Sequence, residues 1–183
     1  MRKLIIPTLL ILLVSCVSKP NKNSESRFGK FVGNLPSKNL PLNFSCGLPD
    51  ESALDNLQSS EFHDYAEFIP SDQNLIYGII GKTQEFTLIV YGESGDDIYP
   101  TLYSYNKLGE RIDSLSLVLS PCGGADGSVI PSSTVHIDKG LRITLSDTIK
   151  YIHYLDNSVY VSDSLKTSSV IYSIDKSGRI IKE

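Results

Sequence analysis

The sequence predicts a mainly β fold: a single antiparallel meander that forms a sandwich or a partly open barrel, with one or two short helices in the N-terminal half. Composition is the first reason, because the 183 residues include ten tyrosines and six phenylalanines but one methionine and no tryptophan. Such a chain suits pleated, half-buried surfaces better than helices. The second reason is the order of segments after Pro70, where short apolar runs alternate with turn residues, as in consecutive strands.

The N-terminal stretch MRKLIIPTLLILLVSC, residues 1–16, has two basic residues, then an apolar run, then a small-residue site that ends at Cys16. The apolar run is shorter than the roughly 20 residues that a membrane-spanning helix needs. The stretch resembles the signal peptide of bacterial lipoproteins. This resemblance implies that residues 1–15 are removed and that Cys16 carries a thioether-linked diacylglycerol and an amide-linked acyl chain. The mature protein is then expected in the bacterial cell envelope, held to a membrane by lipid, with the outer membrane favoured over the inner.

Residues 16–27 are expected to be the lipidated cysteine and a flexible tether, since VSKPNKNSESR is rich in Ser, Asn and Lys and has no apolar period. The remainder, residues 28–183, is long enough for one core, so a single β-rich domain is expected there. Pro36 and Pro41 near its start remove backbone donors and favour extended neighbours. They predict an edge or wrapping segment.

One helical region is predicted between Asp50 and Ile69. Asp50 can cap it, the apolar residues from Phe62 onwards recur at helical spacing, and Pro70 ends it. The strands predicted after it are residues 75–80, 85–91, 99–105, 111–119, 133–137, 141–145, 149–154, 170–174 and 179–181.

Three joints between these strands share a turn chemistry: residues 106–109, 138–140 and 175–178, with the sequences NKLG, DKG and DKSG. Asn or Asp at the first position can accept hydrogen bonds from backbone further along the turn, and Gly accepts a positive φ. The hairpins that these turns close are expected to bury one face and expose the other, as the alternation of polar and apolar residues around Thr144 and Leu145 indicates.

Three features of the mature chain occur together: Leu-Pro pairs at 35–36 and 40–41, the run LYSYNKLGERIDSLSL, and the C-terminal YSIDKSGRIIKE. In this pattern the chain resembles small envelope lipoproteins of Bacteroidota-type bacteria over most of its mature length. Because the shared features are structural, the resemblance implies an envelope location and no particular activity.

Cys46 and Cys122 are the thiols that remain once Cys16 carries lipid. An even pair in an oxidising compartment favours a disulfide between them, which would stabilise the fold by roughly 4 kcal/mol through the long loop that it closes. The alternative is a nucleophilic cysteine assisted by a histidine. The three histidines are His63, His136 and His153. Neither cysteine lies in a signature of such enzymes, so the sequence predicts no catalytic residue.

No metal and no cofactor are predicted. Glu93, Asp96 and Asp97 share a Gly-containing loop that offers oxygen ligands to calcium, but their spacing matches no calcium loop. The scattered histidines argue against a zinc site. Removal of residues 1–15 takes away two basic residues and no acid, and changes the formal charge from −4 to −6. With that charge and no basic run with interleaved aromatics, nucleic acid is not expected as a partner.

Seven tyrosines fall in the strand-rich half: Tyr99, Tyr103, Tyr105, Tyr151, Tyr154, Tyr160 and Tyr172. They either form an exposed stacking surface for glycan or peptide, or pack across strands with their hydroxyls at the rim. The packing interpretation is favoured, and the lack of tryptophan also weakens a sugar-binding platform.

The sequence therefore leads to a lipid-anchored envelope protein with a non-enzymatic binding or structural role. It is expected to attach to the membrane through lipid on Cys16 and to have a protein or a glycan as partner. The alternative is a periplasm-facing inhibitor or immunity protein, whose acidic surface blocks the basic site of a toxin or a lysozyme-like hydrolase. An enzyme would need a concave pocket with a titratable group and an orienting partner, and no motif in the sequence indicates one.

Overall fold

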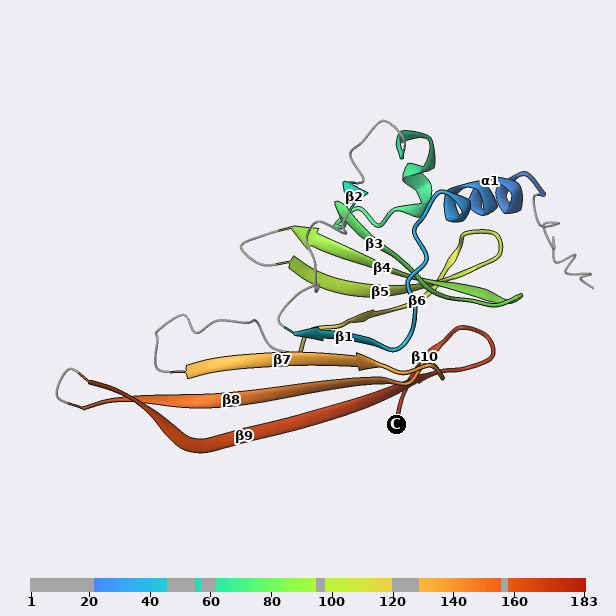
Figure 1. Ribbon diagram of the computed structural model, residues 1–183. Helices are drawn as coiled ribbons and strands as arrows, with labels where there is room; N and C mark the ends of the chain where they lie inside the picture. Colours follow the sequence, from blue (N-terminus) through green and yellow to red (C-terminus); the bar gives the residue numbers. More distant parts are fainter. Residues whose placement is uncertain (1–21, 46–54, 57–61, 95–97, 120–128, 156–157) are drawn as a thin grey trace, which may run out of the picture.

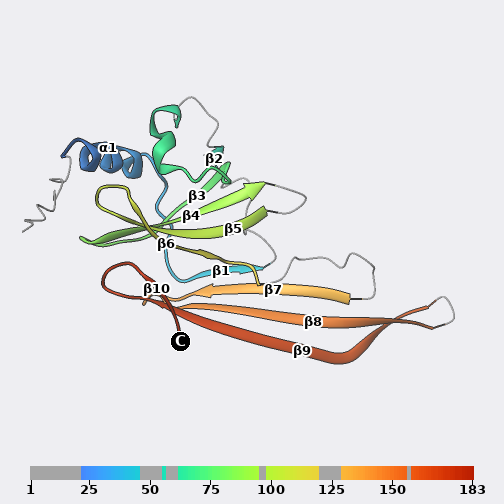
Figure 2. The ribbon, with the colours of Figure 1, turned by 180° about the vertical axis from the view of Figure 1, so that it is seen from behind.

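The computed structural model describes residues 22–45, 55–56, 62–94, 98–119, 129–155 and 158–183. It is mainly β, with two five-stranded antiparallel sheets packed face to face (Figures 1 and 2). This confirms the predicted fold class in its sandwich form. The helix α1 (Lys22–Gly33) and the 3₁₀ helix η2 (His63–Phe68) both belong to the N-terminal half, as predicted.

The sheet that lies between the helices and the second sheet is here called the middle sheet. Its strands, in spatial order, are β2 (Asp55–Asn56), β3 (Leu75–Lys82), β4 (Phe86–Ser94), β5 (Ile98–Asn106) and β6 (Arg111–Ser116). The second sheet is called the outer sheet. Its strands, in spatial order, are β1 (Leu42–Ser45), β7 (Val129–Ile137), β8 (Ile143–Leu155), β9 (Ser158–Ile174) and β10 (Ile180–Lys182).

The middle sheet is buried on both faces at β3 and β4, because successive residues of these strands are apolar. In β4, Ile89 and Tyr91 join the cluster under the helices, whereas Leu88 and Val90 join the cluster between the two sheets. In the sequence this burial is visible as the near-continuous apolar runs LIYGII and FTLIVY. The helices therefore form a third layer over the face of the middle sheet that the outer sheet leaves free.

The outer sheet buries one face and exposes the other. Val135, Ile143 and Leu145 point into the core between the sheets. His136 is exposed, although both of its neighbours in the sequence are buried, and Thr144 is half-buried. The predicted alternation around Thr144 and Leu145 is thus confirmed.

The predicted tether is wrong from Lys22 onwards, because α1 begins there. Phe28, Phe31 and Val32 are buried, and their spacing of three and four residues is that of one helix face. Leu35, just after the end of α1, is buried as well. The polar residues before Phe28 hide this stripe in the sequence, because the helix is stabilised by docking on the middle sheet rather than by its own composition. Residues 16–21 lie outside the described residues.

The helical region predicted between Asp50 and Ile69 is confirmed in part. Among the described residues of this region, His63–Phe68 form a 3₁₀ helix, whereas Asp55–Asn56 form β2 and pair with β3. Ile69 is extended, with φ −96° and ψ 123°, as the residue before Pro70 should be. Residues 50–54 and 57–61 lie outside the described residues.

The predicted strands of the middle sheet and β7 are found close to their expected positions, but β8 and β9 are longer than predicted. Residues 141–145 and 149–154 were expected as two strands, and Ile143–Leu155 form one. β9 starts at Ser158, not at residue 170. Its first twelve residues, SVYVSDSLKTSS, are mostly polar, and their hydrogen bonds with β8 hold them extended.

The three predicted turns are confirmed in their hydrogen bonding. The side-chain Oδ1 atoms of Asn106, Asp138 and Asp175 each accept from two backbone N–H groups, two and four residues further on, at 2.7 to 3.0 Å. In the last turn the Ser177 hydroxyl also donates to Asp175, at 2.7 Å, and together with the backbone donors it lowers the pKa of this carboxyl.

The glycine prediction is confirmed in two of these turns and wrong in one. Gly109 and Gly178 have positive φ, 82° and 86°. In the turn that starts at Asp138, the residue with positive φ is Leu141, at 65°, and not Gly140. Leu141 packs against the core between the sheets, so burial of its side chain compensates for the unfavourable backbone conformation.

The segment around Pro36 wraps the middle sheet, as predicted. The N–H of Ile79 donates to the carbonyl of Pro36 and the N–H of Lys38 donates to the carbonyl of Ile79, both at 2.8 Å. These bonds use a part of β3 that the short strand β2 does not cover. β1 follows and lies at the edge of the outer sheet. Within the described residues, no helix is long and apolar enough to cross a membrane.

Candidate functional site

The residues that the sequence singled out are not brought together into one site. His63 lies on η2, His136 on β7 and His153 on β8. His136 Nδ1 is 2.7 Å from Asn43 Oδ1, a contact between neighbouring strands. Glu93 is exposed at the end of β4. In the part of the chain that the structure describes, no group of three His, Cys, Asp or Glu side chains is placed to hold a metal ion. Cys16, Cys46, Cys122, Asp96 and Asp97 lie outside the described residues.

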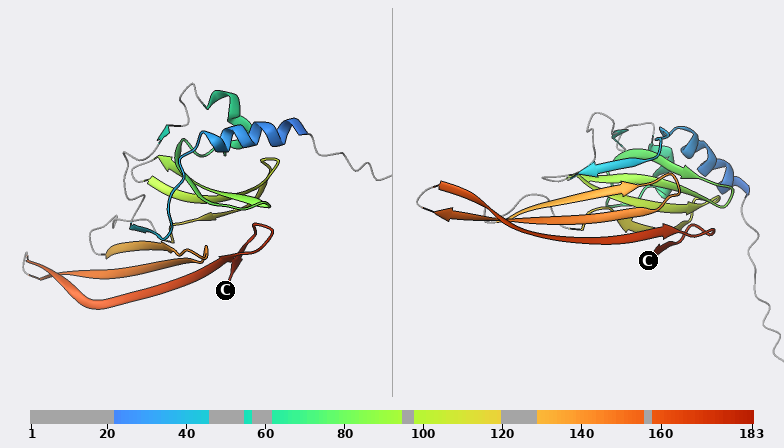
Figure 3. Two further views of the ribbon diagram at one scale, coloured as in Figure 1. Left: turned by 45° about the vertical axis from the view of Figure 1, so that its right-hand side comes forward. Right: turned by 60° about the horizontal axis from the view of Figure 1, so that its bottom comes forward.

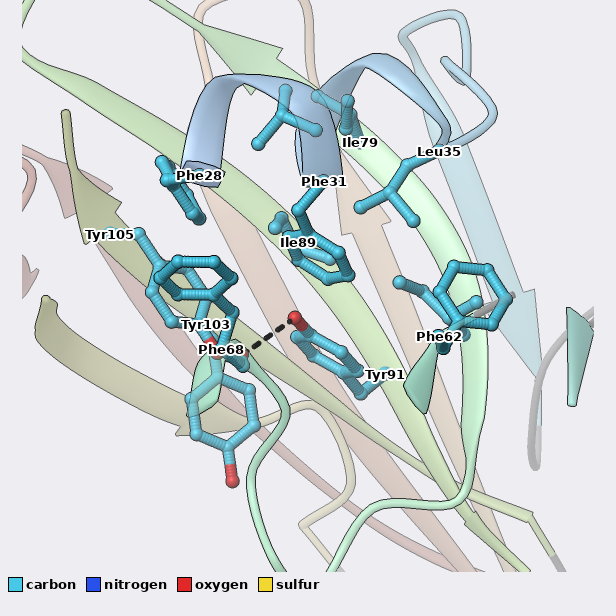
Figure 4. Packing of buried hydrophobic residues seen from close by; sticks show 12 residues of the cluster. Phe28, Phe31, Leu35, Phe62, Phe68, Ile79, Ile89, Tyr91, Tyr103 and Tyr105 are labelled. Carbon is cyan, nitrogen blue, oxygen red and sulfur yellow. Dashed lines mark hydrogen bonds between the residues drawn. The ribbon is translucent and has the colours of Figure 1, made fainter. Parts of the chain in front are cut away.

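Tyr91, Tyr103 and Tyr105 form part of the aromatic cluster under the helices (Figure 4). The Tyr91 and Tyr103 rings meet edge to face, with centroids 5.4 Å apart. The hydroxyls of Tyr91 and Tyr105 both donate to the carbonyl of Phe68, at 3.3 and 3.0 Å. These side chains therefore attach η2 to the middle sheet, and cross-strand packing against Tyr91 is confirmed for Tyr103 and Tyr105. The predicted position of the hydroxyls at the rim is wrong for Tyr105, because its hydroxyl is buried on the carbonyl of Phe68.

The two buried hydroxyls should make the fold sensitive to alkali. Burial raises the pKa of Tyr91 well above its usual 10.0, and burial also raises the pKa of Tyr105. Because the folded pKa exceeds the unfolded one, the stabilisation is fully present below about pH 10 and is lost as the pH rises from there towards the folded pKa. We expect tyrosine absorbance and circular dichroism to show ionisation of these residues and unfolding in one transition. A Tyr91→Phe, Tyr105→Phe variant should unfold at higher pH than the wild type, and an unchanged midpoint would contradict the assignment.

The described surface has no tyrosine platform. Of the large hydrophobic side chains in the described residues, Tyr151 and Ile181 are the exposed ones, at 38% and 46%. Tyr99 and Tyr172 are half-buried. The side chains of Tyr154 and Tyr160 lie outside this description.

The exposed face of the outer sheet carries a row of hydroxyls that crosses four strands. Ser45 pairs with Thr134, Thr134 with Ser146, and Ser146 with Ser169. The Ser146 and Ser169 hydroxyls are 2.8 Å apart. Beside this row lies a shallow hollow of about 540 Å³, lined by residues of β1, β7 and β8, none of them acidic, lysine or arginine. The lining of the hollow thus carries no carboxylate, lysine or arginine, and the row of hydroxyls ends on β9.

β9 has a long edge that no described strand covers. It is 17 residues long, and β10 pairs only with its last three residues. The N–H of Glu183 donates to the carbonyl of Ile171 at 2.9 Å, so the backbone groups of Ile171 point away from β8. Since these directions alternate along a strand, the backbone groups of Thr167 and Ser169 also point away from β8, to the side that no described strand covers. β8 and β9 together extend beyond the middle sheet (Figure 3).

This edge was not predicted from the sequence, because residues 158–169 lie between the predicted strands 149–154 and 170–174 and were expected to be a loop. One signal was available: no Gly or Pro occurs between residues 141 and 177, which is unusual for a region with two loops.

Comparison with known proteins adds no relative, since the chain matches no protein-family model, no curated protein and no solved structure.

Proposed function

We propose that the protein is a lipid-anchored, non-enzymatic binding protein of the bacterial cell envelope that takes up an extended segment of a partner protein along the free edge of β9. The observation that carries the proposal is the length of β9 without a described partner strand. An open edge offers N–H and C=O groups to any extended chain, and natural proteins usually shorten or cover such edges.

The surroundings of the edge favour a protein over a glycan. Glycan sites commonly use aromatic rings as stacking surfaces, and the described aromatic side chains lie mostly in the two cores. The edge itself has exposed polar side chains from Lys166 to Ser169, which suit contact with water and with a peptide. An added strand would continue the hydroxyl row past Ser169 and enlarge the outer sheet without rearrangement of the sandwich.

The anchor is supported by the N-terminal sequence alone. In a Cys16→Ala variant, the acyl mass should disappear from the mature protein and the chain should leave the detergent phase on phase separation. Cys46→Ala is the matched control and should keep both properties. Acylation that persists in Cys16→Ala would exclude this anchor, whatever the outcome for β9.

The binding edge can be tested with a photo-crosslinking residue at Ser169 in the full chain within its native envelope. We expect one stoichiometric protein partner, linked through a contiguous extended segment. Thr167→Pro removes an outward N–H that the described fold does not use, so it should fold normally and lower crosslinking by about tenfold or more. Thr167→Val keeps that N–H and should crosslink like the parent.

Equal crosslinking by folded Thr167→Pro and Thr167→Val would overturn the proposal. So would crosslinks to lipid alone. Crosslinks to a second copy of this chain would replace the partner protein with self-association. A toxin or hydrolase as the crosslinked protein would instead identify the protein as an inhibitor, with β9 as its binding edge.

A further inference from the structure

A second cavity lies on the other side of the molecule, between α1, the hairpin of β3 and β4, and the turn from β5 to β6. We call it the α1 hollow. Its volume is about 340 Å³. Phe28, Val32 and Phe86 contribute buried apolar surface to it, and the exposed lysines Lys82 and Lys107 also line it. The hollow thus joins an apolar interior to a basic rim.

The hollow lies on the helix-covered face of the middle sheet. Thr87 pairs with Lys82 on one side and with Tyr105 on the other, so these three residues form one row across the sheet. Tyr105 belongs to the cluster under the helices, which places the side of Lys82 in this row next to α1. The hairpin that carries Lys82 is held by Thr83, whose Oγ1 accepts from the N–H groups of Glu85 and Phe86 at 3.1 and 3.0 Å.

Gly29 of α1 also lines the hollow. It lies inside α1, where glycine weakens a helix relative to other residues. Its φ is not positive, and a Cβ added to it would meet no atom within 4 Å. Neither backbone conformation nor crowding therefore requires glycine at this position. Because Gly29 lines the hollow and a Cβ there meets no atom, a larger side chain at this position has room to occupy the hollow.

The two lysines have no acidic partner in the described part of the chain. The ion pairs found there are Arg27 with Glu67 and Arg142 with Glu183. Among the described residues, no acidic side chain lines the hollow. Two ammonium groups therefore face a small cavity in which they are complementary to a negative charge.

We propose that the α1 hollow binds an anionic amphiphile, a small molecule with a carboxylate or phosphate head and a short apolar tail. The head lies beside Lys82 and Lys107, and the tail packs against Phe28, Val32 and Phe86. The volume of the hollow is at the lower end of the range for small-molecule sites, so the apolar tail of the ligand must be short. This site is independent of the lipid on Cys16 and of the edge of β9.

The test uses photoactivatable probes on the full chain in non-ionic detergent, with adducts mapped by mass spectrometry. Three probes share one eight-carbon tail and carry a carboxylate, a phosphate or a neutral hydroxyl head. We expect adducts in residues 27–33 or 82–87 from the anionic probes, at about five times or more the yield of the alcohol. Labelling by either anionic head supports the proposal, and the stronger of the two indicates a free carboxylate or a phospholipid as the source.

Variants link the labelling to the hollow. Gly29→Leu fills it with a residue that favours helix, and should abolish the labelling while the fold is retained. A Lys82→Ala, Lys107→Ala double variant should lower the anionic yield to that of the alcohol. Lys139→Ala is the control. Lys139 occupies the second position of the turn that starts at Asp138, and Lys107 occupies the second position of the turn that starts at Asn106. Equal yields from acid and alcohol, or full labelling of the folded double variant, would overturn the site.

Discussion

Replacement of Phe31 with alanine is expected to lower the free energy of unfolding by about 3 to 5 kcal/mol, the usual range for loss of a fully buried aromatic ring. Phe31 is 0% exposed, and its ring packs against more aromatic rings than the ring of any other α1 residue does. Its ring centroid lies 5.6 Å from that of Phe68 and 6.4 Å from that of Phe62 (Figure 4). The ring centroid of Tyr65 is also 5.6 Å away. Removal of the ring leaves a cavity where α1, η2 and the middle sheet meet. Urea denaturation followed by circular dichroism measures the change.

Arg27→Ala is the control on the same helix. Arg27 pairs with Glu67 at 2.8 Å, but both side chains are about half exposed, so the variant should lose less than about 1 kcal/mol. If Phe31→Ala cost no more than Arg27→Ala, α1 would not be docked on the middle sheet. Residues 22–27 would then be part of the tether, as the sequence alone indicated.

This difference between tether and helix shows why part of the fold could be predicted from sequence and part could not. Strands β3 and β4 of the middle sheet could be predicted, because both of their faces are buried and their sequences are largely apolar. The turns could be predicted because Asn106 and Asp175 form their hydrogen bonds within five residues. α1 could not, because its buried stripe starts at Phe28 after six polar residues, and its stability depends on contacts with η2 and β4 that are distant in sequence.

The candidate site was hidden for a related reason. Whether the second edge of β9 is covered depends on the length of β10, and a polar strand such as residues 158–169 looks like a loop until its partner is known. The α1 hollow was hidden because its walls come from three segments: α1, the β3–β4 hairpin and Lys107. In the sequence, the one local indication of the hollow is Gly29. This glycine lies in a helix, and its backbone conformation does not require a glycine.

Gly78→Ala is expected to destabilise the fold by roughly 3 to 5 kcal/mol, because two costs act together at this position. Gly78 has φ 132°, a conformation that residues with a side chain rarely adopt. A Cβ there would also lie 2.3 Å from the carbonyl oxygen of Pro36, which accepts the hydrogen bond from Ile79. Relief of that contact requires the wrapping segment to move away from β3. Urea denaturation should show the loss, and hydrogen exchange should show faster exchange at the N–H groups of Lys38 and Ile79.

Gly33→Ala provides the matched control, since a Cβ at Gly33 would meet nothing within 4 Å and its φ is not positive. Its stability should stay within about 0.5 kcal/mol of the parent. Equal stability of the two variants would mean that the segment around Pro36 does not lie against β3. If instead Gly78→Ala alone loses stability and exchanges faster at both N–H groups, the wrapping segment is held against β3 just before the chain enters β1, which lies at one edge of the outer sheet. On the other side of that sheet, β10 pairs only with the last three residues of β9, so no described strand covers the rest of that edge.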